Sequence, residues 1–409
     1  MFRVVFDETK KKIWRNKKNR LLIILSIISI FIYTLIIMPG QSHPTEAPQS
    51  QFNLQMNTEL NMKEERLADG NIGITRMSGV DSYLYSKQRF ETYDTYAQAL
   101  RDGNAKLLID NIANVWPNHL RNNLDEYVYD RAGLDFNAIV YERGTLTRNL
   151  AFIALHNDIS MHTVQEKTSI QQFYLFFKSY GPLIIFLITI FIASEILVVD
   201  RKHRTLKAGP PISWWKYIFY QSVSTYLIVA VFIAAALTAF FLINGLLYGT
   251  GPADLLVNHY VYQSEGGLSS FRGDPSHFDS QYAWAFVWKS IGLVLMIMFL
   301  LIRLNALFSL IFRHEILVMV IGFAVVLLTI IYGTDGSGEL FGLPGYLLPQ
   351  NYFEVGSVVS GERNYFSTTD MYNFVTGSLV ILVSIVIVEI LLYIATLWMN
   401  RQKFEREVR

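Results

Sequence analysis

Six long, mostly apolar runs are the feature that most limits what this chain can fold into. A helix needs roughly 20 apolar residues to cross the hydrocarbon core of a bilayer, and runs of about that length recur along the sequence. They lie at residues 21–38, 181–199, 218–243, 285–302, 316–332 and 374–398. We therefore expect an all-α integral membrane protein with six transmembrane helices, the first of them an uncleaved anchor because its apolar stretch exceeds that of a signal peptide.

The distribution of basic residues predicts the orientation of these spans. Lys and Arg near span ends favour the cytoplasmic side. Nineteen Lys and Arg residues lie in segments that an even number of spans places on one side, namely 1–20, 200–217, 303–315 and 399–409. The loops 249–284 and 333–373, on the other side, hold one each. Both termini are therefore expected in the cytoplasm.

The spans also predict how the chain divides into domains. The large segment between the first two spans is long enough to fold on its own. We expect a cytoplasmic amphipathic interface helix at 1–20, the first span at 21–38, a mostly helical extracytoplasmic domain at 39–173, a five-span membrane domain at 174–398 and a cytoplasmic tail at 399–409. Within the membrane domain, 200–216 is a cytoplasmic loop, and the Gly- and Pro-rich segment 333–373 forms either an outer re-entrant loop or a surface loop.

The N-terminal 20 residues have the pattern of a helix lying on a membrane surface. Phe2, Phe6, Thr9 and Ile13 recur at helical spacing, and neighbouring lysines suit the anionic head groups of membrane lipids. The simpler alternative is a basic flank of the first span without a fixed helix.

Helical spacing also recurs in the extracytoplasmic domain, from Phe90 to Leu100 and from Leu108 to Trp116. Aromatic residues then gather just before Gly181-Pro182, where the chain re-enters the bilayer, and are typical of an interfacial belt. They are Phe173, Tyr174, Phe176, Phe177 and Tyr180.

Several kinds of chemistry are excluded by what the sequence lacks. With no cysteine there is no disulfide framework and no thiolate metal site. There is no G-x-x-x-x-G-K-[ST] to hold ATP phosphates, no H-E-x-x-H, and the eight histidines lack ligand spacing. A net charge of +1 gives no support for nucleic-acid binding. We expect no metal site, no cofactor in this chain and no enzymatic activity of the chain by itself.

Three ionisable residues lie within the predicted spans, all in the cytoplasmic third. Each is costly in lipid and should face protein, water or the interface. For Arg303, reaching water from the end of its span is favoured over a buried ion pair. Glu389 lies deeper, so we expect it to pair with Arg303 or to contact a neighbouring helix. Glu195 precedes the cytoplasmic loop.

That loop, between the second and third spans, carries the most informative pattern. An acidic–basic pair, Asp200-Arg201, is followed by Thr205-Leu206 and then by Pro211-Ile212-Ser213. The pattern resembles the first intracellular loop of type-2 ATP-binding-cassette (ABC) exporter permeases. Arg204 stands where that family usually has Gly, and Tyr220-Gln221 where Gly-Lys is common. Six spans, an interfacial N-terminal helix and a large domain after the first span also resemble this family.

The resemblance implies a permease subunit that does not itself hydrolyse ATP. The residues coupling it to a cytoplasmic ABC ATPase, which binds ATP and Mg²⁺, would be Asp200, Arg201, Thr205, Leu206, Pro211 and Ser213. One six-span permease encloses half a pathway, so the expected partner in the membrane is a second copy or a related permease. Small polar residues among apolar ones in the second and sixth spans favour an amphipathic cargo such as a peptide, antimicrobial, lipid or drug; they are Thr189, Ser194, Ser378 and Ser384.

Two other functions stay open. The chain could be an ATP-independent receptor or scaffold whose outer domain binds a ligand, although it has no cytoplasmic signalling module to match. A secondary transporter is a third reading, weakened by the lack of charges near the midplane. The composition is compatible with a multi-pass protein of a Gram-positive plasma membrane.

Overall fold

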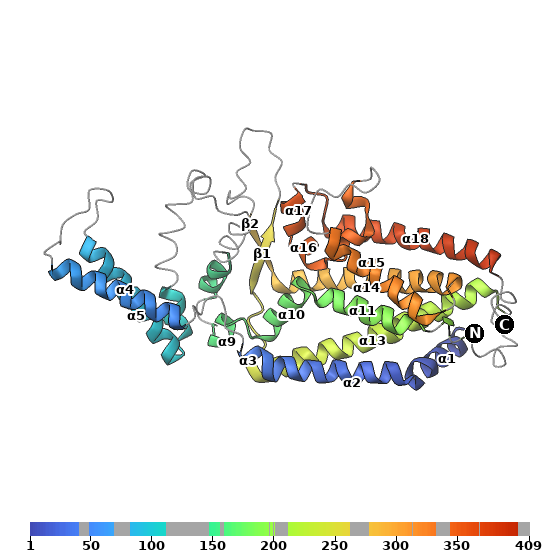
Figure 1. Ribbon diagram of the computed structural model, residues 1–409, viewed down its shortest axis with the longest axis horizontal. Coiled ribbons are helices and arrows are strands. Elements are labelled where there is room, and N and C mark those ends of the chain that lie inside the picture. The colour runs from blue at the N-terminus through green and yellow to red at the C-terminus, as the bar shows by residue number, and fades with distance from the viewer. Residues whose placement is uncertain are drawn as a thin grey trace.

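The fold is a bundle of long helices with smaller elements gathered at one end (Figure 1). The computed structural model describes residues 1–40, 49–68, 82–111, 147–155, 159–195, 197–198, 200, 212–261, 278–312, 314–332, 344–367 and 369–399. The helix α1 (Phe2–Arg15) and the C-terminal end of α18 (Phe374–Trp398) lie at one end of the bundle. The helices α4 (Gln49–Ala68) and α5 (Ser82–Asp102) lie at the opposite end.

Within the described part of the chain, four helical stretches are long and apolar enough to cross a membrane, which confirms the transmembrane character of the chain. They are Lys17–Gly40, which joins α2 (Lys17–Ile32), η1 (Tyr33–Ile37) and α3 (Met38–Gly40), then α13 (Trp214–Tyr248), α14 (Ala283–Ile311) and α18. The helix α15 (Glu315–Tyr332) is apolar but shorter. The arrangement of six spans therefore stays a prediction.

The second predicted span, 181–199, begins with a helix of only 13 residues, and a bend precedes it. Two segments, α9 (Met161–Val164) with α10 (Ser169–Lys178) and then α11 (Gly181–Ala193), meet at a bend of 67° and make a fifth span only if counted together. Pro182 stands in the first turn of α11, where its missing N–H costs nothing. A Cβ on Gly181 would lie 2.3 Å from the carbonyl oxygen of Phe176, so the bend requires glycine there.

The helix α14 forms the centre of the bundle. It packs against α10, α11, α13, α15 and α18. In its second half, from Leu300 to Leu310, buried residues fall on every side of the helix, as expected for a helix surrounded by protein. By contrast, α2 and α18 keep long rows of exposed Leu, Ile and Val residues, which is the surface expected of helices that face lipid.

The aromatic run of α10 is mostly core, so the predicted interfacial belt is wrong for three of its members. Phe173, Tyr174 and Phe177 are buried, and the rings of Phe173 and Phe240 stack with centroids 5.9 Å apart. Only the end of the run, Tyr180, is largely exposed, at 69%. The bend after α10 directs these rings into the bundle instead of along a membrane surface.

The first span contains a π-helical turn, η1, next to Pro39. In this turn the N–H of Met38 bonds to the carbonyl of Tyr33, five residues earlier. The next carbonyl, that of Thr34, has no such donor because proline lacks an N–H. The hydroxyl of Tyr248 donates to it instead, at 3.3 Å.

The prediction of an all-α protein is wrong in one place. In the loop predicted at 249–284, β1 (Leu256–Tyr260) and β2 (Phe278–Tyr282) form an antiparallel pair that sets Val257 opposite Gln281. Valine and tyrosine suit a half-buried strand, and Val257 and Tyr260 are buried here. The N–H of Tyr260 donates to the carbonyl of Ser360 at 2.7 Å, which ties the strands to the segment before α18.

That segment consists of short helices packed on the bundle. They are η4 (Gly345–Leu347), η5 (Pro349–Tyr352), α16 (Val355–Val359) and α17 (Glu362–Ser367). Tyr352, Phe353 and Val355 are buried there, which fits a loop covered by protein on one side. Of the two helical patterns predicted in the extracytoplasmic domain, the first lies in α5 and is confirmed. The second is helical over 105–111, and its remainder lies outside the described residues.

Candidate functional site

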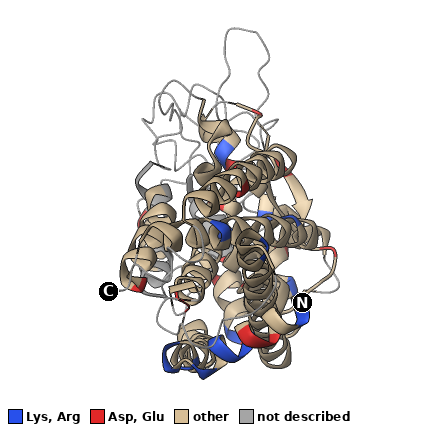
Figure 2. Ribbon diagram, turned by 90° about the vertical axis from the view of Figure 1, so that its right-hand side faces the viewer, with Lys and Arg blue, Asp and Glu red and all other residues tan. Residues whose placement is uncertain are grey.

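The N-terminal helix α1 is docked on the protein. Val5, Thr9 and Ile13 form its buried face, one turn apart, against α13. Val4 and Trp14 stay exposed. The predicted helix is therefore present, but its buried face is rotated from the predicted one, since Phe2 is 39% exposed and Val5 only 3%. Figure 2 looks onto this end, with Lys and Arg concentrated at the lower edge, where α1 and the first turns of α2 lie.

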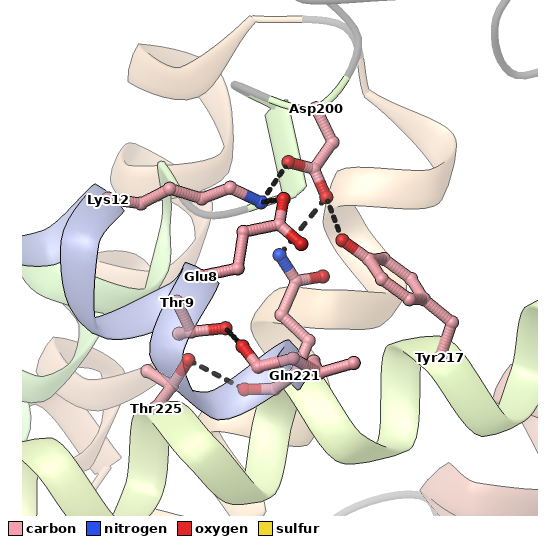
Figure 3. A network of polar contacts seen from close by, with 8 residues as sticks. Glu8, Thr9, Lys12, Asp200, Tyr217, Gln221 and Thr225 are labelled. Carbon is pink, nitrogen blue, oxygen red and sulfur yellow. Dashed lines mark hydrogen bonds and ion pairs between the residues drawn. The ribbon is translucent and has the colours of Figure 1, made fainter. Parts of the chain in front are cut away.

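A buried carboxylate holds α1 to the membrane helices. Asp200 is 4% exposed, and its Oδ1 accepts a hydrogen bond from the ammonium of Lys12 at 2.6 Å (Figure 3). Its Oδ2 accepts from the hydroxyl of Tyr217 and from the amide of Gln221, both at 3.1 Å. Glu8, one turn before Lys12, adds an ion pair at 2.9 Å. We call Glu8, Lys12, Asp200, Tyr217 and Gln221 the Asp200 cluster.

Each member is placed by regular helical spacing. Tyr217 and Gln221 are four residues apart on α13 and so lie on one face, as Glu8 and Lys12 do on α1. Thr9 donates its hydroxyl to the carbonyl of Val5, which keeps the polar atom satisfied within the buried face. The two faces meet at Asp200, the last described residue before the loop 201–211.

The electrostatics of the cluster favour a charged Lys12. Burial by itself lowers the pKa of the Lys12 ammonium, but the charge and hydrogen bond of Asp200, with those of Glu8, outweigh it. The net effect is a raised pKa. The ammonium therefore stays charged across the physiological range and the ion pair persists.

A second contact holds the start of α2. The side chain of Asn16 donates to the carboxylate of Glu195, and the ammonium of Lys18 lies 3.7 Å from the same carboxylate. Lys18 also lies 4.3 Å from the ring centroid of Phe191. Glu195, predicted from sequence as an intramembrane polar residue, thus joins the end of the second apolar run to the junction of α1 and α2.

Arg303 and Glu389 form an ion pair in the interior, as predicted for Glu389. The Nε of Arg303 donates to Glu389 Oε2 at 2.9 Å, and its Nη2 contacts the same oxygen. Its Nη1 donates to the hydroxyl of Ser222 at 2.9 Å. Arg303 is 0% exposed, so the favoured prediction that it reaches water is wrong. Its position on the central helix α14 surrounds it with protein.

A small cavity is lined by residues that bond to Asp200 and to Arg303. Gln221, Ser222 and Thr225 of α13 supply its polar lining, and Ala193, Leu197, Ile302 and Ala306 its apolar lining. It has room for about one water molecule. Two consecutive residues of α13 thus form hydrogen bonds to different ion pairs, since Gln221 bonds to Asp200 and Ser222 to Arg303.

Only part of the predicted coupling motif lies in the described chain. Arg201, Thr205, Leu206 and Pro211 lie outside the described residues. Ser213 is exposed and directly precedes α13, and its carbonyl accepts from the N–H of Tyr217 at 3.0 Å.

Sequence reasoning missed the partners of Asp200. Lys12 is one of the lysines whose pattern suits lipid head groups, although its spacing from Glu8 indicates a paired face. Gln221 stands out in the sequence only as a departure from the family pattern. Among the residues that the structure describes, no group of three or more His, Cys, Asp or Glu is placed to hold a metal ion.

Comparison with protein-family models, curated proteins and solved structures finds no match. The site therefore has to be interpreted from its own geometry.

Proposed function

We propose that this chain is the membrane-spanning permease subunit of an ABC exporter, driven by a separate cytoplasmic ATPase that binds ATP and Mg²⁺. The observation that carries the proposal is the anchoring of the loop 201–211. Asp200, directly before the loop, is bonded to α1 through Lys12 and to α13 through Tyr217 and Gln221.

Such anchoring suits a loop that transmits force. The described residues on both sides of the segment 201–211 belong to one cluster, since Asp200 precedes it and α13, which carries Tyr217 and Gln221, begins three residues after it. Trp214, at the start of α13, stacks on Tyr217 with ring centroids 5.7 Å apart. A displacement of the loop by a partner would move α1, the end of the second apolar run and α13 together, as in a rigid-body transition.

In this proposal Asp200 is a positioning residue. Its carboxylate already accepts hydrogen bonds from Lys12, Tyr217 and Gln221. We therefore expect residues of the loop to contact the ATPase, with Arg201, Thr205 and Leu206 as the candidates. The end of the bundle that carries α1 is placed in the cytoplasm, where its basic residues meet anionic lipid head groups. A second permease copy, or a related permease, completes the pathway.

The proposed cargo is an amphipathic molecule moved outward. Two of the residues expected to line its path are not available for it in this structure, because Thr189 and Ser194 are 0% exposed and donate to carbonyls of their own helix segment. Ser378 and Ser384 of α18 are partly exposed and also bond to backbone carbonyls. Because these four hydroxyls bond to backbone carbonyls, the support for an amphipathic cargo comes from the apolar side chains of the spanning helices.

The test is reconstitution with an ATPase. The chain is co-expressed with a P-loop ATPase encoded by a neighbouring gene, purified and placed in lipid discs, where ATP hydrolysis is measured with and without candidate cargo. We expect a stable complex, and we expect Arg201→Glu to weaken it. Lys11→Glu, a charge reversal on the exposed side of α1, is the matched control. If no ATPase co-purifies and the outer domain binds a ligand without ATP, the chain is a receptor or scaffold instead.

A further inference from the structure

The far end of the first span and the part of α13 that faces it contain buried polar groups that the Asp200 cluster does not involve. Asn244 of α13 is 0% exposed, and both polar atoms of its side-chain amide lack a hydrogen-bond partner among the described residues. Thr34 of η1 is also 0% exposed, and its hydroxyl lacks a partner in the same part of the chain.

These two residues lie on one interface. Tyr33 contacts Phe240 with ring centroids 5.9 Å apart, and the hydroxyl of Tyr248 donates to the carbonyl of Thr34 at 3.3 Å. Asn244 is one helical turn after Phe240 and one before Tyr248, so it falls on the face of α13 that meets η1. Thr34 faces inward, because the residues after it in η1 are 46–70% exposed.

The chemistry of the two side chains is complementary to one small polar group. A carboxamide offers two donors and an acceptor, and a threonine hydroxyl offers one donor and acceptor sites. Leaving such groups unpaired in an apolar interior is costly, so buried polar atoms are nearly always paired with protein or ordered water. A hydroxyl group can accept from the Asn244 amide and donate to the Thr34 oxygen at the same time.

We propose that the interface of η1 with α13 is a binding site for one hydroxyl group, supplied by a water molecule or by the head of an amphipathic alcohol. The outer faces of the two segments are apolar, with Ile36 70% and Leu246 87% exposed, so the surroundings of the interface suit lipid. The inference does not depend on the proposed ATP-driven transport.

The first experiment measures thermal unfolding of the purified chain in a lipid–detergent mixture. Asn244→Leu and Thr34→Val each remove the hydrogen-bonding groups at nearly constant size. Each is expected to lower the midpoint by about 2–4 °C. The midpoint of the double variant should fall by less than the sum of the two single falls, since both residues bind the same group. Thr189→Val is the matched control, a 0% exposed threonine whose hydroxyl bonds within its own helix.

Two results would overturn the proposal. An unchanged or higher midpoint for Asn244→Leu would mean that the amide is simply unsatisfied, because an apolar replacement then stabilises the interior. Strictly additive losses would mean that the two residues share no ligand.

The source of the hydroxyl is identified by adding 1-dodecanol or, as its control, dodecane. If dodecanol raises the midpoint of the wild-type chain relative to dodecane but leaves that of Asn244→Leu unchanged, the site accepts an amphipathic alcohol. If both proteins respond alike to both compounds while the variants keep their non-additive losses, the bound group is water. Either outcome supports the site.

Discussion

The ammonium of Lys12 lies 2.6 Å from Oδ1 of Asp200, across 188 positions of sequence. This ion pair joins a helix on the surface of the bundle to the residue directly before the loop 201–211. Because Asp200 also accepts from Tyr217 and Gln221, the position of α1 and the position of the loop depend on each other. A substitution at Asp200 should therefore alter the stability of α1, and a substitution in α1 should alter the position of Asp200.

The first prediction is that Asp200→Asn releases α1. The change keeps the size of the side chain but removes the buried counter-charge of the Lys12 ammonium, which keeps its ion pair with Glu8. We expect the free energy of unfolding to fall by about 1–3 kcal/mol, at or below the range for breaking a buried pair, since Lys12 keeps Glu8 and some contact with solvent. Hydrogen exchange should speed up across residues 2–15, because α1 detaches more often.

Asp7→Asn is the matched control, since Asp7 is an exposed acid on the same helix. It should change exchange in α1 very little. Equal effects of the two substitutions would show that Asp200 does not anchor α1.

Sequence patterning could predict the elements whose signal is local. Long apolar runs predicted the main helices, and the helical repeat from Phe90 to Leu100 predicted a helix within α5. A carboxylate deep in an apolar run has few permitted surroundings, so Glu389 could be assigned a partner, and Arg303 is that partner. Such inferences work because burial in an apolar region limits the alternatives.

Contacts between distant segments could not be predicted in the same way. A lysine near the start of the chain fits lipid head groups and a buried aspartate equally well, and only the docking of α1 on α13 decides between them for Lys12. The same holds for Phe173 and Phe177, whose pattern suits a membrane interface until the bend at Gly181-Pro182 directs them into the core. The hairpin β1–β2 is short and depends on its attachment at Ser360.

The second prediction concerns the interior ion pair. Glu389→Gln leaves the fully buried Arg303 guanidinium without a counter-charge, which typically costs about 3–5 kcal/mol. We expect a clear fall in the thermal midpoint. The double substitution Arg303→Met with Glu389→Leu should recover much of the loss, because it removes both charges from the interior.

Glu195→Gln is the matched control for this pair. The ammonium of Lys18, which is paired with Glu195, is 29% exposed and lies 3.7 Å from the Glu195 carboxylate. The free energy of unfolding should therefore fall by only about 0–1 kcal/mol. If the thermal midpoint falls no further for Glu389→Gln than for Glu195→Gln, Arg303 and Glu389 do not form a tightly held pair.

The third prediction is acid sensitivity of the hairpin β1–β2. Burial, with the nearby charge of Lys289, lowers the pKa of His259 even though Asp279 across the hairpin and the backbone of Ser360 act in the opposite direction. A lowered pKa in the folded state favours neutral His259. Stability is therefore complete above the unfolded pKa of about 6.5 and falls as the pH drops toward the folded value.

Hydrogen exchange of residues 256–260 and 278–282, corrected for the intrinsic rate, should be faster at about pH 5 than at about pH 8. His259→Gln should abolish the difference, whereas His162→Gln, which changes a histidine outside the hairpin, should preserve it. If the difference persists in His259→Gln, His259 is not the group responsible for it.

The last prediction concerns the attachment of the short helices to β1. Gly361 has φ +78°, and a Cβ there would lie 2.0 Å from the carbonyl oxygen of Tyr260. Gly361→Ala therefore incurs both the cost of a left-handed residue, about 1–2 kcal/mol, and a backbone clash. Gly103 has φ +62° with nothing within 4 Å of a built Cβ, so Gly103→Ala isolates the conformational cost. The thermal midpoint should fall further for Gly361→Ala than for this control, and hydrogen exchange at residues 256–260 should become faster. Equal falls of the two midpoints would show that the clash with Tyr260 adds no cost, because β1 and α17 can move apart freely.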